Sequence, residues 1–147
     1  MISVRPCTLE DMHAIMGEVV GIEGLPSDFV DEIADETYTK WCRTICEDGE
    51  PIATMGVFPK WAGVGVAWAW LPAEALDSRP VAVGKIAKRL LSQAFDTGEF
   101  RRVEATVDLK FWRAQEWIEM LGFRVEGLME HYGPGGEADH YMYARLE

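Results

Sequence analysis

The sequence has no apolar run long enough to cross a membrane as a helix. Its first residues, Met1 to Arg5, also lack the charged and apolar pattern of a signal peptide. These absences favour a cytoplasmic protein that does not contact a membrane. No linker, internal repeat or low-complexity stretch interrupts the chain, and 48% of its 147 residues are hydrophobic. We therefore expect one domain over residues 1–147, large enough to bury a single core.

Positive charge is scarce. The 14 lysines and arginines are outnumbered by 25 aspartates and glutamates, which gives a formal net charge of −11. An acidic surface repels phosphate, so nucleic-acid binding is not expected. Ordinary solubility and mimicry of a nucleic acid both remain open as explanations of this charge.

The chain has only three cysteines, Cys7, Cys42 and Cys46, and this odd number suits a reducing compartment. If residues 42–46 form a strand, Cys42 and Cys46 lie about 13 Å apart, too far for a disulfide. No histidine is close to them in sequence, so a zinc site is not expected. We interpret all three as small thiols that are buried or half-buried.

Hydrophobic periodicity and turn residues predict the order β-α-α-β-β-β-α-β-α-β-β, a mixed α/β (α+β) sheet with helices on both faces. Thr8 and Asp11 have the spacing of a capping box at the start of the first helix, and Asp48-Gly49 is typical of a hairpin turn. The expected strands cover residues 2–6, 41–47, 52–58, 64–71, 101–107 and 124–129, with a last strand beyond 133–136. The expected helices run from 8 to about 20 and over 27–39, 80–97 and 110–121, and a turn is expected at 59–63.

The helix over 110–121 carries the most informative motif. Phe111, Ala114, Ile118 and Leu121 fall on one face of this helix. Gly122 then supplies a left-handed stop, and Phe123 is placed to fold back onto the helix. Strand-like runs lie on both sides of this motif.

This arrangement resembles the C-terminal half of the GNAT N-acyltransferases, and the element order of the whole chain is similar to theirs. The resemblance implies a GNAT-like fold in which the fourth and fifth strands separate and acyl-CoA enters between them. A closer resemblance links the chain to small GNAT-like proteins of tailed bacteriophages. It is carried by Gly63 to Trp68, by Ser78-Arg79-Pro80, and by Val107-Asp108 through Leu121-Gly122-Phe123.

The resemblance also implies where acetyl-CoA binds. The family's phosphate motif is matched by Arg79 to Gly84, with Ala82 in place of the usual glycine. A helix N-terminus suits a pyrophosphate, and the exposed face of this helix carries Lys85, Lys88 and Arg89. That basic face has a second interpretation, an ordinary solvated helix surface. The expected cofactor-binding residues are Trp70 and Leu71, whose backbone polarises the thioester, together with Arg79, Ala82, Val83, Gly84, Lys85 and Lys88.

Two positions depart from the family pattern. Phe111 replaces an asparagine that touches the cofactor, and Ile118 replaces a tyrosine that reprotonates the thiolate. Either another residue moves the proton or catalysis is weak or absent.

The candidate catalytic residues are Asp108, Glu104 and Tyr132, with His131 beside Tyr132. Each has a structural alternative. Asp108 can cap the following helix, Glu104 can be solvated or pair with Arg102, and residues 131–132 can form a strand end. The neighbouring Trp68 and Trp70 share one side of their strand, where they either line a pocket or pack beneath a helix.

The resulting hypothesis is an N-acetyltransferase that moves an acetyl group from acetyl-CoA to a primary amine. The acidic surface favours a cationic acceptor such as a polyamine, a lysine side chain or an amino sugar. The resemblance also implies pairing into a homodimer through sheet edges. The alternative is a phage structural or host-interaction protein, with a host or virion protein as partner, that keeps the fold without turnover. A nucleic-acid mimic that inhibits an enzyme is a third hypothesis.

Overall fold

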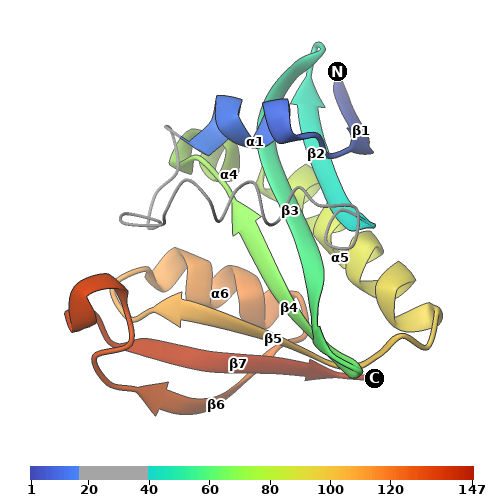
Figure 1. The fold of residues 1–147 in the computed structure, drawn as a ribbon. Helices are drawn as coiled ribbons and strands as arrows, with labels where there is room; N and C mark the ends of the chain where they lie inside the picture. The colour runs from blue at the N-terminus through green and yellow to red at the C-terminus, as the bar shows by residue number, and fades with distance from the viewer. Residues whose placement is uncertain (17–39) are drawn as a thin grey trace.

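The computed structural model describes residues 1–16 and 40–147 (Figure 1). The helix expected over 27–39 lies outside the described residues. The described elements, in chain order, are β1 Ile2–Pro6, α1 Leu9–Met16, β2 Trp41–Glu47, β3 Glu50–Trp61, β4 Gly63–Trp70, α4 Ala73–Ser78, α5 Pro80–Asp96, β5 Phe100–Asp108, α6 Trp112–Met120, β6 Arg124–Met129, the short 3-10 helix η1 Pro134–Gly136 and β7 His140–Leu146.

All the described strands belong to one seven-stranded sheet in the order β1-β2-β3-β4-β5-β7-β6. Strands β4 and β5 form its one parallel pair among these strands. They pair only from Gly63 to Val66 on β4 and from Phe100 to Glu104 on β5. Beyond these residues they separate toward Trp70 and Asp108, so the sheet opens into a wedge (Figure 1).

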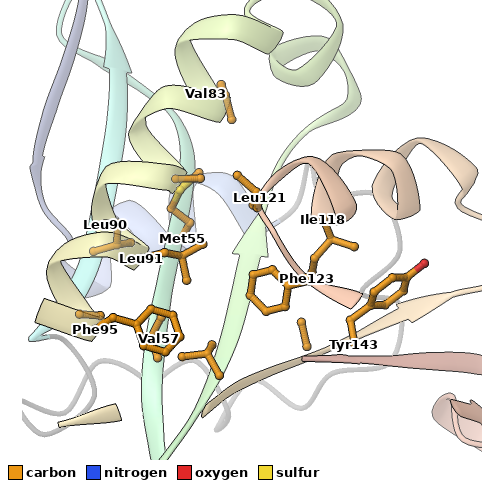
Figure 2. Close-up of a cluster of buried hydrophobic side chains, with 14 of the residues drawn as sticks. Met55, Val57, Val83, Leu90, Leu91, Phe95, Ile118, Leu121, Phe123 and Tyr143 are labelled. Carbon is orange, nitrogen blue, oxygen red and sulfur yellow. The ribbon is translucent and has the colours of Figure 1, made fainter. Parts of the chain in front are cut away.

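Helices cover both faces of the sheet, as predicted. Helix α5 packs against β2, β3 and β5, whereas α1 packs against β3 from the opposite side (Figure 1). Figure 2 shows the core on the α5 side, where α5, the end of α6, β3 and β7 meet. Its buried side chains include Met55, Val57, Val83, Leu90, Leu91, Phe95, Ile118, Leu121, Phe123 and Tyr143.

Local hydrogen bonds explain where several elements begin and end. The Asp11 backbone N–H donates to Thr8 Oγ1 over 3.2 Å and the Thr8 N–H donates to Asp11 Oδ2 over 3.1 Å, which confirms the capping box. Gly122 has φ +95, and the Phe123 N–H donates back to the Ile118 carbonyl over 3.3 Å. Since Phe123 is also buried, the predicted stop after α6 is confirmed.

The three cysteines are free and buried, as interpreted from the sequence. Among the described residues, no helix is both long and apolar enough to span a membrane.

Most described elements begin or end within two residues of the prediction, and three differences stand out. Strand β3 continues to Trp61, so residues 59–61 do not form a turn. The pairing of β3 with β4 shifts register after Pro59, and this shift accommodates the proline, which has no backbone N–H. The segment before α5 contains the unpredicted helix α4, which lacks a side-chain cap. Helix α6 starts at Trp112, because the Phe111 N–H first closes a turn onto the Asp108 carbonyl.

Gly65 lies where β4 and β5 are still paired, and its missing side chain is required there. A Cβ would stand 2.7 Å from Val57 Cγ1 and 2.8 Å from Phe100 Cε1, both buried. We expect Gly65→Ala to lower the free energy of unfolding by about 1–2 kcal/mol through overpacking, measured by urea unfolding. Gly127→Ala is the matched control, because a Cβ on Gly127 meets nothing within 4 Å. Equal stabilities of the two variants would contradict the prediction.

Candidate functional site

The wedge between β4 and β5 holds a cavity of about 360 Å³, which we call the strand cavity. Ala67 and Ala69 line it from the side of the sheet that faces α5, and their neighbour Trp68 lines it from the opposite side. The strand cavity therefore passes through the sheet at the point where β5 stops pairing with β4. The end of β5 contributes Asp108 to the same wall.

A second hollow of about 520 Å³, the helix groove, lies between α5 and α6. Gly84, Lys85 and Lys88 line it from α5, while Trp117 and Met120 line it from α6. A Cβ on Gly84 would lie 3.0 Å from the Met120 methyl carbon, so the glycine lets the two helices approach each other closely.

The two hollows meet beside α4. Both are lined by Leu76, Asp77, Trp112, Arg113 and Trp117. At this junction Arg113 of α6 forms an ion pair with Asp77 of α4. The two hollows are therefore neighbours that share a wall, to which the unpredicted helix α4 contributes, and we refer to the two together as the path.

Buried polar atoms without a hydrogen-bond partner concentrate along this path. Among the described residues there are four: Thr54 Oγ1, Trp68 Nε1, Trp117 Nε1 and His140 Nδ1. Trp68, Trp117 and His140 all line the strand cavity. A buried unpaired polar atom costs roughly 1–3 kcal/mol. A ligand with polar groups of its own could pair with the three atoms in the cavity wall.

Four of the expected cofactor-binding residues line this path. Leu71 lines the strand cavity, and Gly84, Lys85 and Lys88 line the helix groove. The lysines are exposed and lie one helical turn apart on α5. The structure thus brings together Gly84 and two of the four basic residues that the sequence singled out, Lys85 and Lys88, whereas Arg79 and Arg89 line neither hollow.

The other four expected cofactor residues do not line either hollow. Arg79 pairs with Glu47 at the end of β2, with Nε donating over 3.0 Å, and this hydrogen bond raises the pKa of Arg79. Trp70 and Val83 are buried in the interior, and Ala82 is half-buried. The Val83 N–H donates to the Arg79 carbonyl over 3.0 Å, so it belongs to the helix.

The sequence offered two interpretations of Trp68 and Trp70, lining a pocket or packing in the interior, and each residue follows one of them. Their rings lie 5.3 Å apart on the side of the sheet away from α5. Trp70 is 1% exposed and packs in the interior, whereas Trp68 lines the strand cavity. Gly56 on β3 makes room for the Trp68 ring, since a Cβ there would come within 2.9 Å of it.

Of the expected catalytic residues, Asp108 lines the strand cavity. Its Oδ1 accepts the Lys110 backbone N–H over 2.8 Å. The alternative that Asp108 caps the following helix is wrong, because the N-cap of α6 is Phe111. Phe111 and Ile118, the two apolar replacements, line the same cavity.

Glu104 is held in an ion-pair network outside both hollows. Lys60 Nζ lies 3.0 Å from Glu104 Oε2, and Arg102 Nε lies 3.1 Å from Oε1, which confirms the predicted pairing with Arg102. Burial raises the pKa of Glu104, but the hydrogen bonds from Lys60 and Arg102 outweigh it and leave the pKa below its ordinary value. A carboxylate held in this way is a poor proton acceptor.

Tyr132 is 54% exposed and also stands outside both hollows. Its ring lies edge-on to His140, with 5.3 Å between the ring centres. The adjacent His131 has Nδ1 2.7 Å from the Gly136 carbonyl oxygen and does not line either hollow.

Sequence reasoning missed His140, which lines the strand cavity. The register between β5 and β7 places it directly opposite Asp108. The predicted strand order contained a signal for this residue. If the last strand pairs antiparallel with the fifth strand, the first residue of the last strand lies beside the final residue of the fifth. The histidine earlier in the connection, His131, was singled out instead.

Comparison with solved structures identifies the fold. The chain is similar to a ribosomal-protein-S18-alanine N-acetyltransferase from Escherichia coli, with TM-score 0.81, 13% identity and coverage of 99% of this chain and 94% of that chain. It is also similar to a GNAT-family acetyltransferase from Streptococcus pneumoniae, with TM-score 0.74, 14% identity and 99% of each chain covered. A chimeric spermidine N-acetyltransferase from Vibrio cholerae matches with TM-score 0.74, 13% identity and coverage of 99% of this chain and 95% of that chain.

The chain therefore has the GNAT-like fold that the sequence predicted, a mixed α+β arrangement around a seven-stranded sheet. No protein-family model and no curated protein matches the sequence. At these low identities the likeness to the solved structures shows the fold alone. The closer resemblance to phage proteins stays a prediction.

Proposed function

We propose that the protein binds acetyl-CoA and transfers its acetyl group to a primary amine. The observation that carries this proposal is the adjacent pair of hollows, the helix groove and the strand cavity, with three unpartnered polar side-chain atoms in the cavity wall. Trp117 lines both hollows, so its unpaired Nε1 lies along the path of an elongated ligand. In this arrangement Lys85 and Lys88 hold the phosphates, and the wedge between β4 and β5 takes the thioester arm.

The open edge of β4 suits the thioester. β5 does not pair with β4 beyond Val66, so the β5-facing backbone groups of the last β4 residues are free of the parallel ladder. A backbone N–H from this edge, near Trp70 and Leu71, is the proposed donor that polarises the thioester carbonyl. Acetyl-CoA supplies the activated acetyl group, and the protein positions the carbonyl for direct attack by a neutral amine.

The acceptor is proposed to be a cationic amine. The net charge of −11 attracts cations, and residues 130–139 between β6 and β7 contain Glu130, Glu137 and Asp139 but no lysine or arginine. This segment leads into His140 at the cavity wall. Polyamines, lysine side chains and amino sugars all have the required charge and a primary amine. Formation of a homodimer through a sheet edge stays a prediction.

Isothermal titration of the protein with acetyl-CoA tests the proposal. We expect saturable binding with a micromolar dissociation constant and a matching rise in the melting temperature. Absence of both heat and thermal shift at millimolar acetyl-CoA would contradict the proposed function. That result would favour a phage structural or host-interaction protein that keeps the fold without turnover, consistent with the apolar Phe111 and Ile118 in the cavity wall. A search for a protein partner would then also test the nucleic-acid mimic.

A further inference from the structure

The strand cavity has a polar corner where β5 ends and β7 begins. His140 and Asp108 are directly opposite each other across this strand pair, which puts their Cβ atoms roughly 5 Å apart on one face of the sheet. Their neighbours Tyr141 and Val107 face the core beneath α5, so His140 and Asp108 point to the other side of the sheet. Both line the strand cavity.

Residues of the segment between β6 and β7 pack against the His140 ring. Tyr132 lies edge-on to it at an interplanar angle of 61°. On the Nε2 side it meets the Gly133 backbone, where a Cβ would come within 3.1 Å of Nε2. Gly133 is fixed in turn, because its N–H donates to the Ala138 carbonyl over 2.9 Å. The remaining nitrogen, Nδ1, is buried and has no hydrogen-bond partner.

The other titratable side chains of the strand cavity are less suited to moving a proton. They are Asp77, Asp108, Lys110 and Arg113. Asp77 and Arg113 are paired with each other, and Asp108 already accepts the Lys110 backbone N–H. Lysine and arginine side chains carry positive charge and offer no acceptor. Imidazole is the one group in this set that both accepts and releases a proton near neutral pH.

We propose that His140 is the catalytic residue that accepts the proton of the attacking amine at Nδ1. This inference rests on the proposed function. As the amine nitrogen bonds to the acetyl carbonyl carbon, the carbon–sulfur bond breaks and the nitrogen loses one proton to Nδ1. The imidazolium then returns that proton to the sulfur of the departing CoA through water, so the ring ends neutral and the products are the acetamide and the free thiol. Asp108 across the strand pair stabilises the imidazolium while it exists.

Variants of the two neighbouring histidines test this role. His140→Asn keeps a hydrogen-bonding group near the position of Nδ1 but cannot carry a proton, and His140→Gln is the second variant. His131→Asn is the matched control, because His131 lies outside both hollows and asparagine tolerates its φ of +53. Acetyl transfer is measured by loss of thioester absorbance with spermidine, a lysine-containing peptide and glucosamine as acceptors. Acetyl-CoA binding is measured separately by titration.

We expect both His140 variants to bind acetyl-CoA as the unaltered protein does and to lose about 100-fold or more in kcat. The His131 variant should keep its kcat. A kcat within threefold of the unaltered protein in either folded His140 variant would overturn the proposal. Acetyl-CoA binding without turnover on any acceptor would also overturn it, while leaving the binding half of the proposed function intact. No acetyl-CoA binding at all would mean that the proposed function itself has failed.

A measurement on the unaltered protein keeps the proposal testable if the His140 variants do not fold. Nitrogen NMR of the His140 ring in the acetyl-CoA complex should show a proton on Nε2 and none on Nδ1. The tautomer with the proton on Nδ1 would overturn the proposal, because that nitrogen could not then accept the amine proton.

Discussion

Reversing the charges of Lys85 and Lys88 together is expected to weaken acetyl-CoA binding by about 100-fold. Both side chains are exposed on α5 and line the helix groove, within reach of phosphates bound there. Each reversal replaces an attraction by a repulsion, and roughly 1.4 kcal/mol at each position corresponds to tenfold in affinity. Titration of Lys85→Glu, Lys88→Glu with acetyl-CoA at constant ionic strength measures the effect, which should shrink as salt is added.

The matched control is Arg101→Glu, Arg124→Glu, which changes the net charge by the same amount. Both arginines are exposed, and neither lines the groove or the strand cavity. Its dissociation constant should stay within about threefold of the unaltered protein, because screening weakens charges that lie away from the site. Equal losses in the two double variants would mean that overall charge, and not the groove, governs binding.

Much of the fold was predictable, because local signals and long-range packing agree. Strands β2 and β6 begin and end at the predicted residues, since hydrophobic patterning and flanking turns mark both ends. Asp48 and Gly49 have φ of +51 and +85, as their hairpin turn requires. Where one residue carries the stop, as Gly122 does after α6, the sequence places the boundary closely.

The errors arise where tertiary contacts override local preference. Pro59 predicted a turn, but β3 pairs with β4 on both sides of it and absorbs the proline at a register shift. Helix α4 has six residues and no side-chain cap, so its sequence carries little helical signal. It is stabilised by its packing against α5 and by the ion pair from Asp77 to Arg113.

The candidate site was predictable only in part, because local patterns locate some of its residues and long-range contacts locate the others. Lys85 and Lys88 were found because helical periodicity places both on the outer face of α5. Arg79 precedes the same helix, but its guanidinium is engaged by Glu47, a residue 32 positions away in the chain. His140 was missed because its significance depends on the strand opposite, which pairing register determines and the local pattern does not.

A second large effect is expected in the interior on the α1 side of the sheet, where Asp11 holds a buried network. Asp11 is 3% exposed, and its carboxylate accepts hydrogen bonds from the Arg5 guanidinium at 2.9 and 2.6 Å and from Thr44 Oγ1 at 2.9 Å. It also accepts the Thr8 N–H of the capping box. Asp11→Asn removes the charge and leaves these donors imperfectly paired. We expect it to lower the free energy of unfolding at neutral pH by about 3 kcal/mol, measured by urea unfolding.

The pH dependence of this loss identifies its electrostatic origin. Burial raises the pKa of Asp11, but the hydrogen bonds from Thr44, Thr8 and Arg5 outweigh it and leave the pKa below the ordinary 3.8. Since the folded state binds the proton less tightly than the unfolded state does, the charge stabilises the fold above pH 3.8 and this contribution disappears as the pH falls below that value. The difference between the unaltered protein and Asp11→Asn should therefore be largest near neutrality and shrink in acid.

Asp48→Asn is the control, because Asp48 is an exposed carboxylate paired with the N-terminus. This substitution should lower the free energy of unfolding by less than about 1 kcal/mol. Equal losses at positions 11 and 48, or a difference at position 11 that persists in acid, would show that the buried network does not carry the effect.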